Sequence, residues 1–173
     1  MKGVSKRTIG IGPKKGKQFK VECPTTYLST ILFHNGTIIR LTLSFDVIAH
    51  QRNHIELYGN KGSIIVPDPN MFGGSAFVSV TAGGNWGEHK TDMMPLGKIN
   101  IKSQSSRANE SPTNANYRGA GLSEMAYAIE NNLEHRCNGE LSLHVLDIID
   151  STMRASQTGI PQEIKTTCKK PKP

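Results

Sequence analysis

The fold is decided by residues 26–45, which read TYLSTILFHNGTIIRLTLSF. Two stretches of alternating apolar residues flank Asn35-Gly36, and this dipeptide tolerates the positive φ angles of a type I′ turn. A two-residue turn at this point places Leu32 opposite Ile39. The sequence therefore predicts a β-hairpin of two antiparallel strands.

This register gives the hairpin two different faces. One face is apolar and suited to a core, and it carries Leu28, Thr30, Leu32, Ile39, Leu41 and Leu43. The other face mixes polar and apolar side chains, and it carries Tyr27, Ser29, Ile31, Phe33, Ile38, Arg40, Thr42 and Ser44. A mixed face this apolar favours a sheet with one side on its own core and the other side against a partner.

Turn residues and apolar periodicity divide the rest of the chain into further elements. Two helices are expected, one ending near Asn131 and one running from about Leu141 to a C-cap at Gly159. Short strands are expected at 4–9, 54–58, 63–66, 77–80 and 86–90, with a last one at 161–166. Strands followed by helices predict an α+β fold, with an open, mainly antiparallel β-sheet and helices packed on one face.

Length and composition are those of one folded domain. Residues 1–173 are expected to form a single α+β domain, with a long surface loop at 91–116 and a basic tail at 169–173. No apolar run approaches the ~18 residues of a membrane span, and the N-terminus lacks the apolar stretch of a signal peptide. A cytoplasmic protein that contacts no membrane is therefore expected.

The net charge of +7 is concentrated at the two ends of the chain. Residues 1–20 hold seven Lys or Arg and no acid, whereas residues 21–164 hold ten basic and fourteen acidic residues. Nucleic-acid binding usually uses a basic face on the folded body, with aromatic residues between the charges. Binding to nucleic acid is therefore not expected, and a basic nucleic-acid-binding domain is kept as an alternative.

Motifs for metal, disulfide or phosphate chemistry are weak. The three cysteines lie far apart and form no CxxC, and the six histidines form no HExxH. The glycine-rich and lysine-rich loop at 10–17 misses the spacing of both the dinucleotide fingerprint and the P-loop. No catalytic residue, metal ligand or cofactor-binding residue is therefore assigned.

Three residues are candidates for contact with a substrate. Tyr117 and Arg118 lie where the long loop meets the first helix, and a guanidinium beside free N–H groups suits a hydroxylated or anionic ligand. The alternative for Arg118 is a cap or an ion pair that holds the loop. His144, three residues before Asp147, either lies near a substrate pocket or packs against the sheet or the neighbouring helix.

Several short motifs together resemble one enzyme family. The motifs are Glu56-Leu-Tyr58-Gly59-x-x-Gly62-Ser63, Val66-Pro-Asp-Pro-Asn70-x-Phe72-Gly73-Gly74, Arg118-Gly119-x-Gly121, His135-Arg136-x-Asn138-Gly139-Glu140 and Leu143-His144-Val145-Leu146-Asp147. Their order and spacing over residues 4–168 are similar to those of the C-terminal domain of the Gfo/Idh/MocA family, the glucose–fructose oxidoreductases and inositol dehydrogenases.

The resemblance implies a Rossmann domain that binds NAD or NADP, followed by this α+β domain. It implies hydride transfer between the nicotinamide and a carbon–oxygen centre of a sugar, a cyclitol or a related hydroxyl compound. It also implies that the open face of the sheet mediates contacts between subunits, so that the protein is a homo-oligomer.

Three parts of the family pattern are absent from these 173 residues: the dinucleotide fingerprint, the Glu-Lys-Pro that supplies a lysine, and the Asp/His-bearing helix that precedes the first strand of the domain. We therefore expect a truncated or fragmentary chain whose missing N-terminal Rossmann domain lies upstream or on a separate chain. Such a chain is the substrate-side and oligomerisation domain of an NAD(P)-dependent dehydrogenase, holds no cofactor and catalyses nothing alone. The alternative is a non-enzymatic, self-associating β-sheet module.

Overall fold

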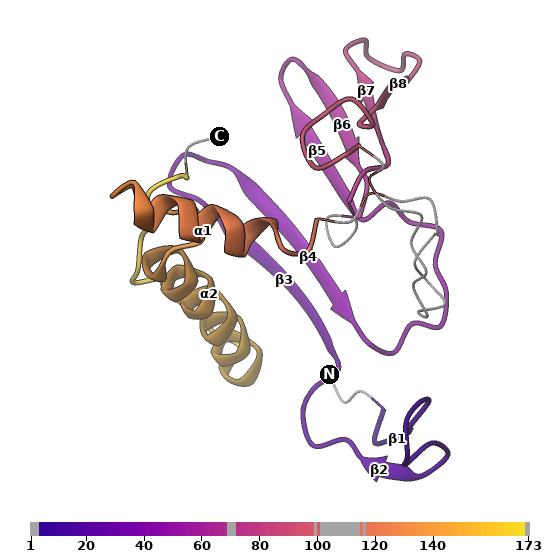
Figure 1. Ribbon diagram of the computed structural model, residues 1–173. Coiled ribbons are helices and arrows are strands. Elements are labelled where there is room, and N and C mark those ends of the chain that lie inside the picture. The colour runs from indigo at the N-terminus through magenta and orange to yellow at the C-terminus, as the bar shows by residue number, and fades with distance from the viewer. Residues whose placement is uncertain (1–3, 69–71, 99, 101–114, 116, 172–173) are drawn as a thin grey trace. The chain divides into compact units, whose positions relative to one another are not determined.

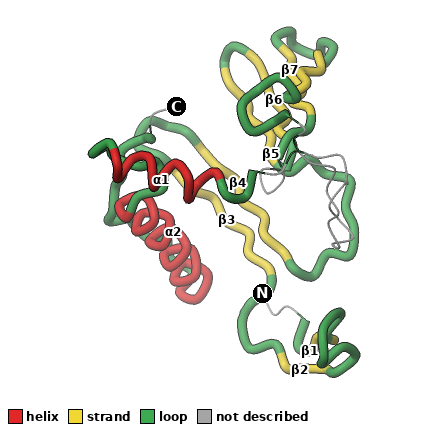
Figure 2. The backbone as a smooth tube through the Cα atoms, viewed as in Figure 1, coloured by secondary structure: helices red, strands yellow, loops and turns green. Residues whose placement is uncertain are grey.

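The computed structural model describes residues 4–68, 72–98, 100, 115 and 117–171. The chain divides into two compact units, one formed by Met1–His50 with Cys137–Pro173 and the other by Gln51–Arg136. Figures 1 and 2 show the helices and strands of both units. Most of the expected loop at 91–116 lies outside the described residues, as do the last two residues of the expected basic tail.

The first unit contains two β-hairpins and the longer helix. Strand β1 (Lys6–Thr8) pairs with β2 (Gln18–Lys20), and β3 (Thr26–Leu32) pairs with β4 (Ile38–Ser44), in both cases antiparallel. Helix α2 spans Gly139–Thr158. Its ends carry the caps that favour a helix, because the Asn138 side chain accepts a hydrogen bond from the backbone N–H of Leu141 and Gly159 has a φ of 69°.

The β3–β4 hairpin is confirmed, but the register expected from the sequence is wrong by one residue. Leu32 pairs with Ile38, not with Ile39. The connecting loop holds three residues, 34–36, because Gly36 adopts a φ of 85° at the position of a G1 bulge. Both this loop and a type I′ turn favour glycine at positive φ, so the Asn-Gly dipeptide alone does not distinguish them.

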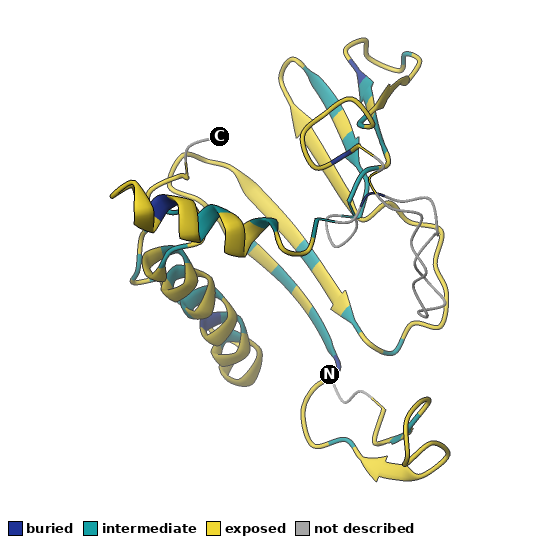
Figure 3. Ribbon diagram, viewed as in Figure 1, coloured by how far each residue is buried: buried dark blue, intermediate teal, exposed yellow. Residues whose placement is uncertain are grey.

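The shifted register redistributes the side chains between the two faces of the hairpin. The expected core face is wrong, since Leu28 and Leu32 lie on the opposite face from Leu41 and Leu43. The more covered face carries Tyr27, Ser29, Ile31, Ile39, Leu41 and Leu43. The other face carries Leu28, Thr30, Leu32, Ile38, Arg40 and Thr42, all of which are exposed. Exposed residues alternate with less exposed ones along β3 (Figure 3).

The second unit contains a four-stranded antiparallel sheet and the shorter helix. The strands lie in chain order, β5 (Ile55–Gly59), β6 (Gly62–Val66), β7 (Ser75–Ser79) and β8 (Gly87–Lys90), and α1 spans Ala120–Glu130. Gly62 begins β6 where the chain passes very close to β7. A Cβ atom on Gly62 would lie 2.6 Å from the carbonyl oxygen of Ser79, so this position needs glycine.

The segment after α2 is extended but forms no strand, and the expected strand at 161–166 is therefore wrong. The reason lies in its backbone N–H groups. Those of Lys165 and Thr166 donate to the carboxylate of Asp147 on α2, at 2.9 and 3.0 Å, rather than to a neighbouring strand. A helix side chain thus takes the place of a sheet partner.

The α+β class with open antiparallel sheets is confirmed. The described strands form three separate sheets, and the single-domain organisation stays a prediction. Among the described residues, the buried apolar side chains are those of Ala115 and Ala128. Within the described part of the chain, neither helix is long and apolar enough to cross a membrane.

Substituting Gly36 tests the observed turn. We expect Gly36→Ala to lower the free energy of unfolding by about 1–2 kcal/mol, because a Cβ atom disfavours the left-handed conformation by that amount. Urea unfolding followed by circular dichroism measures the change. Gly10→Ala is the matched control: a Cβ atom there meets nothing within 4 Å and Gly10 has no positive φ. Equal losses in the two variants would contradict the assigned turn.

Candidate functional site

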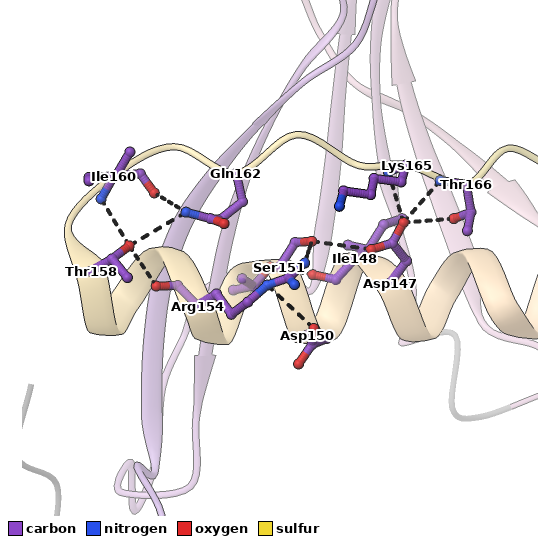
Figure 4. A network of polar contacts seen from close by, with 11 residues as sticks. Asp147, Ile148, Asp150, Ser151, Arg154, Thr158, Ile160, Gln162, Lys165 and Thr166 are labelled. Carbon is purple, nitrogen blue, oxygen red and sulfur yellow. Dashed lines mark hydrogen bonds and ion pairs between the residues drawn. The ribbon is translucent and has the colours of Figure 1, made fainter.

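The densest polar cluster beside a candidate residue is centred on Asp147 of α2. One carboxylate oxygen accepts hydrogen bonds from the backbone N–H groups of Lys165 and Thr166 and, at 3.0 Å, from the Thr166 hydroxyl. The other oxygen accepts from the Ser151 hydroxyl at 3.3 Å. Figure 4 shows these contacts between α2 and the extended segment that follows it.

These hydrogen bonds favour the ionised form of Asp147. Donation by the backbone N–H and the hydroxyl of Thr166 lowers the pKa of Asp147 below its ordinary value of 3.8. The N–H of Lys165 and the Ser151 hydroxyl lower the pKa further, while partial desolvation opposes them. At neutral pH the carboxylate is therefore charged and can only accept hydrogen bonds.

His144 joins the same cluster through Thr166. Its Nδ1 atom lies 3.0 Å from the Thr166 hydroxyl oxygen, which is itself 3.0 Å from the Asp147 carboxylate. His144 and Asp147 are three residues apart on α2, and this spacing places them on one face of the helix. The side chain of His144 is half-buried, and within the described residues no hydrogen bond reaches its Nε2 atom.

The polar cluster continues toward the C-terminal end of α2. The Arg154 guanidinium donates to the Ser151 hydroxyl at 3.0 Å and lies 3.4 Å from the carboxylate of Asp150. The Thr158 hydroxyl accepts from the backbone N–H of Ile160, as the chain turns back along the helix (Figure 4). The extended segment is therefore fastened to α2 at both ends.

Tyr117 lies in the second unit and has a clear packing role. Its hydroxyl donates to the carbonyl oxygen of Lys98 at 3.0 Å, and its ring packs edge-on against Phe72 with a centroid distance of 5.8 Å. Phe72 in turn pairs with Ala115 through an isolated β-bridge. The Tyr117 side chain thus contacts both the segment after β8, at Lys98, and the connection between β6 and β7, at Phe72.

Arg118 directly precedes Gly119, the N-cap of α1, and its side chain is exposed. Gly119 offers no side-chain cap to the helix. The sequence-based placement of Arg118 beside a helix N-terminus is confirmed. Tyr117 and Arg118 belong to one compact unit and His144 to the other, so the three candidates do not share a unit.

Two further polar clusters fasten β-strands. The Asp46 carboxylate, just after β4, accepts from the Thr25 hydroxyl and lies 2.8 Å from the Arg7 guanidinium of β1. The Thr25 hydroxyl and then Arg7 lower the pKa of Asp46. On β5, hydrogen bonds from the Tyr58 hydroxyl and the Asn53 amide lower the pKa of Glu56.

Within the described residues, no group of three or more His, Cys, Asp or Glu side chains is arranged to hold a metal ion. The three cysteines are not joined in disulfides. The Asp147 cluster offers hydrogen bonding and proton exchange through its carboxylate, hydroxyl and imidazole groups.

Sequence reasoning found His144 but missed Thr166 and the part played by Asp147. A signal existed for Asp147, because a spacing of three residues on a helix places two side chains on one face. No comparable signal pointed to Thr166, which lies 22 residues from His144 and outside any regular element. The contact of Arg7 with Asp46, 39 residues away, was missed for the same reason.

Comparisons of this chain with protein-family models, curated proteins and solved structures found no match.

Acid titration tests the Asp147 cluster. Because the folded-state pKa of Asp147 is lowered, its contribution to stability is present above the unfolded value near 3.8 and is lost as the pH falls through the folded pKa. We expect Asp147→Asn to lower the melting temperature at neutral pH, and this deficit to shrink below about pH 4. Thermal unfolding at several pH values measures it.

Asp150→Asn is the matched control for Asp147→Asn, since Asp150 lies on the same helix in an exposed ion pair with Arg154. Exposed ion pairs contribute little to stability, so this variant should melt close to the wild type at neutral pH. An Asp147→Asn deficit that stays constant down to pH 2 would contradict the assigned hydrogen bonds.

Proposed function

We propose that the chain is the C-terminal, substrate-side and oligomerisation domain of an NAD(P)-dependent oxidoreductase that acts on a sugar, a cyclitol or a similar hydroxyl compound. The nicotinamide nucleotide is held by a Rossmann domain outside these 173 residues. The family resemblance described above supplies the reaction class. Open antiparallel sheets support the proposal because they are the architecture that the resemblance implies.

The observation that carries the oligomerisation part of the proposal is the exposed face of the β3–β4 hairpin, on which three large aliphatic side chains lie beside Thr30, Arg40 and Thr42. Leu28, Leu32 and Ile38 are 62%, 73% and 63% exposed on this face. Large aliphatic side chains gathered on one exposed face are typical of a surface that another protein surface covers. A second copy of the chain, docked through the same face, would cover them with apolar atoms.

Substrate contact in this proposal is made by side chains that can hydrogen-bond hydroxyl groups. Arg118 supplies an exposed cation at a helix N-terminus, and His144 supplies a half-buried ring nitrogen. Tyr117 contributes chiefly by shaping the loop, because its hydroxyl already donates to the Lys98 carbonyl. Arg118 and His144 lie in different units, so each is a separate candidate for orienting a ligand. In this proposal the Rossmann domain with its lysine supplies the chemistry.

A self-associating β-sheet module without enzymatic partners is the second candidate, and the same exposed face favours it. The two candidates differ in what they bind. A substrate-side domain contacts sugars or cyclitols, whereas a purely structural module binds neither these nor nucleotides.

Ligand binding separates the two candidates. We expect saturation-transfer NMR to detect binding of myo-inositol or D-glucose to the purified chain, while NADH and NADPH fluorescence stays unchanged on its addition. Arg118→Ala should weaken the sugar or cyclitol affinity about tenfold, because a charge-assisted hydrogen bond is lost.

Arg40→Ala is the matched control for this experiment, since Arg40 is equally cationic but lies on the exposed face of the hairpin. Absence of any signal from both hydroxyl compounds would favour the structural module. Tight binding of NADH by the chain alone would contradict the assignment of the nucleotide to a separate domain.

Light scattering after size-exclusion chromatography tests the oligomer contact. We expect the wild type to self-associate and Leu32→Lys with Ile38→Glu to be monomeric, because charges on the exposed face resist desolvation. The two residues face each other across the strands, so the opposite charges keep a favourable cross-strand pair.

Ile48→Lys is the control for the loss of an exposed isoleucine, since the Ile48 side chain is fully exposed outside any strand. This variant should associate like the wild type. A wild-type chain that stays monomeric at high concentration, or a double variant that still associates, would rule out the hairpin face as the contact.

A further inference from the structure

The contact between His144 and Thr166 fixes more than the position of the imidazole ring. A neutral imidazole carries one N–H, on either Nδ1 or Nε2, and the hydrogen bond at one nitrogen decides which. The Thr166 hydroxyl has a single hydrogen atom, so it can donate to only one of its two neighbours, His144 and Asp147.

The Asp147 carboxylate receives that hydrogen atom. It is ionised at neutral pH and cannot donate, and its oxygen lies 3.0 Å from the hydroxyl oxygen of Thr166. If Thr166 donated to His144 instead, the hydroxyl oxygen of Thr166 and the carboxylate oxygen of Asp147 would lie 3.0 Å apart with no hydrogen atom between them. Two acceptor oxygens at that distance repel each other. The hydroxyl therefore accepts from Nδ1 of His144, which must carry the hydrogen atom.

We propose that Asp147, acting through Thr166, holds neutral His144 with its hydrogen atom on Nδ1, so that the Nε2 lone pair is presented to a hydroxyl group of the ligand. Asp147 and Thr166 are then positioning residues, and His144 is the group that touches the ligand. The identity of the ligand as a sugar or cyclitol rests on the proposed function; the state of the ring does not.

Two observations favour a ligand at Nε2 over a purely structural histidine. Within the described residues, no protein group is hydrogen-bonded to Nε2, although Nδ1 is fully engaged. A hydroxyl ligand would supply the missing hydrogen bond of the imidazole, because the ligand O–H donates to Nε2, the nitrogen that lacks a hydrogen atom. The Asp147 carboxylate accepts from four donor groups, of which two are the backbone N–H and the hydroxyl of Thr166. These two bonds together limit the rotation of the Thr166 side chain.

The state of the ring is measured by long-range ¹H–¹⁵N correlation NMR of the full chain with ¹⁵N-labelled histidine, near pH 8, where imidazoles are neutral. We expect the His144 Nδ1 resonance to show the shift of a nitrogen that carries hydrogen and Nε2 that of one that does not. The reverse assignment in the wild type would overturn the inference.

Thr166→Val removes the hydroxyl at constant shape and should return His144 toward the Nε2–H form, whereas Thr166→Ser should keep the wild-type form. Thr152→Val is the matched control, because that hydroxyl bonds only within α2, to the Ile148 carbonyl. An unchanged His144 spectrum in a folded Thr166→Val chain would overturn the inference. If Thr166→Val fails to fold, the spectra of the wild type and of Thr166→Ser still show which ring nitrogen of His144 carries the hydrogen atom.

Titration with myo-inositol and D-glucose tests the ligand contact in the same spectra. We expect a shift of His144 Nε2 on binding, and an affinity about three- to tenfold weaker in Thr166→Val. Binding seen by saturation transfer with no change at Nε2 would overturn the inference while leaving the proposed function intact. Loss of all binding with Nδ1 still carrying the hydrogen would instead refute the proposed function.

Discussion

The dominant physical constraint on this chain is that most of its large apolar side chains stay exposed to solvent. The sheets carry leucine, isoleucine and valine on more than one face, yet the only buried apolar side chains of the described residues are alanines, Ala115 and Ala128. Exposed apolar surface of this kind is unfavourable in water and is relieved by burial against another surface. The exposed aliphatic side chains of the hairpin are the physical basis of the proposal that a partner surface covers them.

Two carboxylates hold together segments that share little apolar packing. Asp46 fastens β1 to the end of β4, and Asp147 fastens the extended C-terminal segment to α2. Each carboxylate accepts several hydrogen bonds at once, which is the arrangement that keeps a carboxylate charged. The same anchoring gives the proposed site its order, because Thr166 can orient His144 only while Asp147 holds the segment in place.

Sequence patterns predicted elements well and long-range contacts poorly. The helix ends at Asn131 and Gly159 and the strands around Gly62 followed from local capping and turn chemistry, which depends on few neighbouring residues. The register of β3 and β4 failed because one dipeptide suits two loops, and a shift of one residue exchanges the faces. The role of Thr166 could not be predicted from the sequence, since its partners His144 and Asp147 are brought to it only when the chain folds back along α2.

If another copy of the chain covers the exposed hairpin face, the methyl groups on that face lose contact with solvent as the chains associate. A soluble paramagnetic agent broadens methyl NMR signals according to their exposure. We expect strong broadening of the Leu32 and Ile38 methyl signals in dilute protein and protection of both at high concentration, while the Ile48 signals stay broadened throughout. Broadening of Leu32 and Ile38 that does not change with protein concentration would contradict this contact between copies.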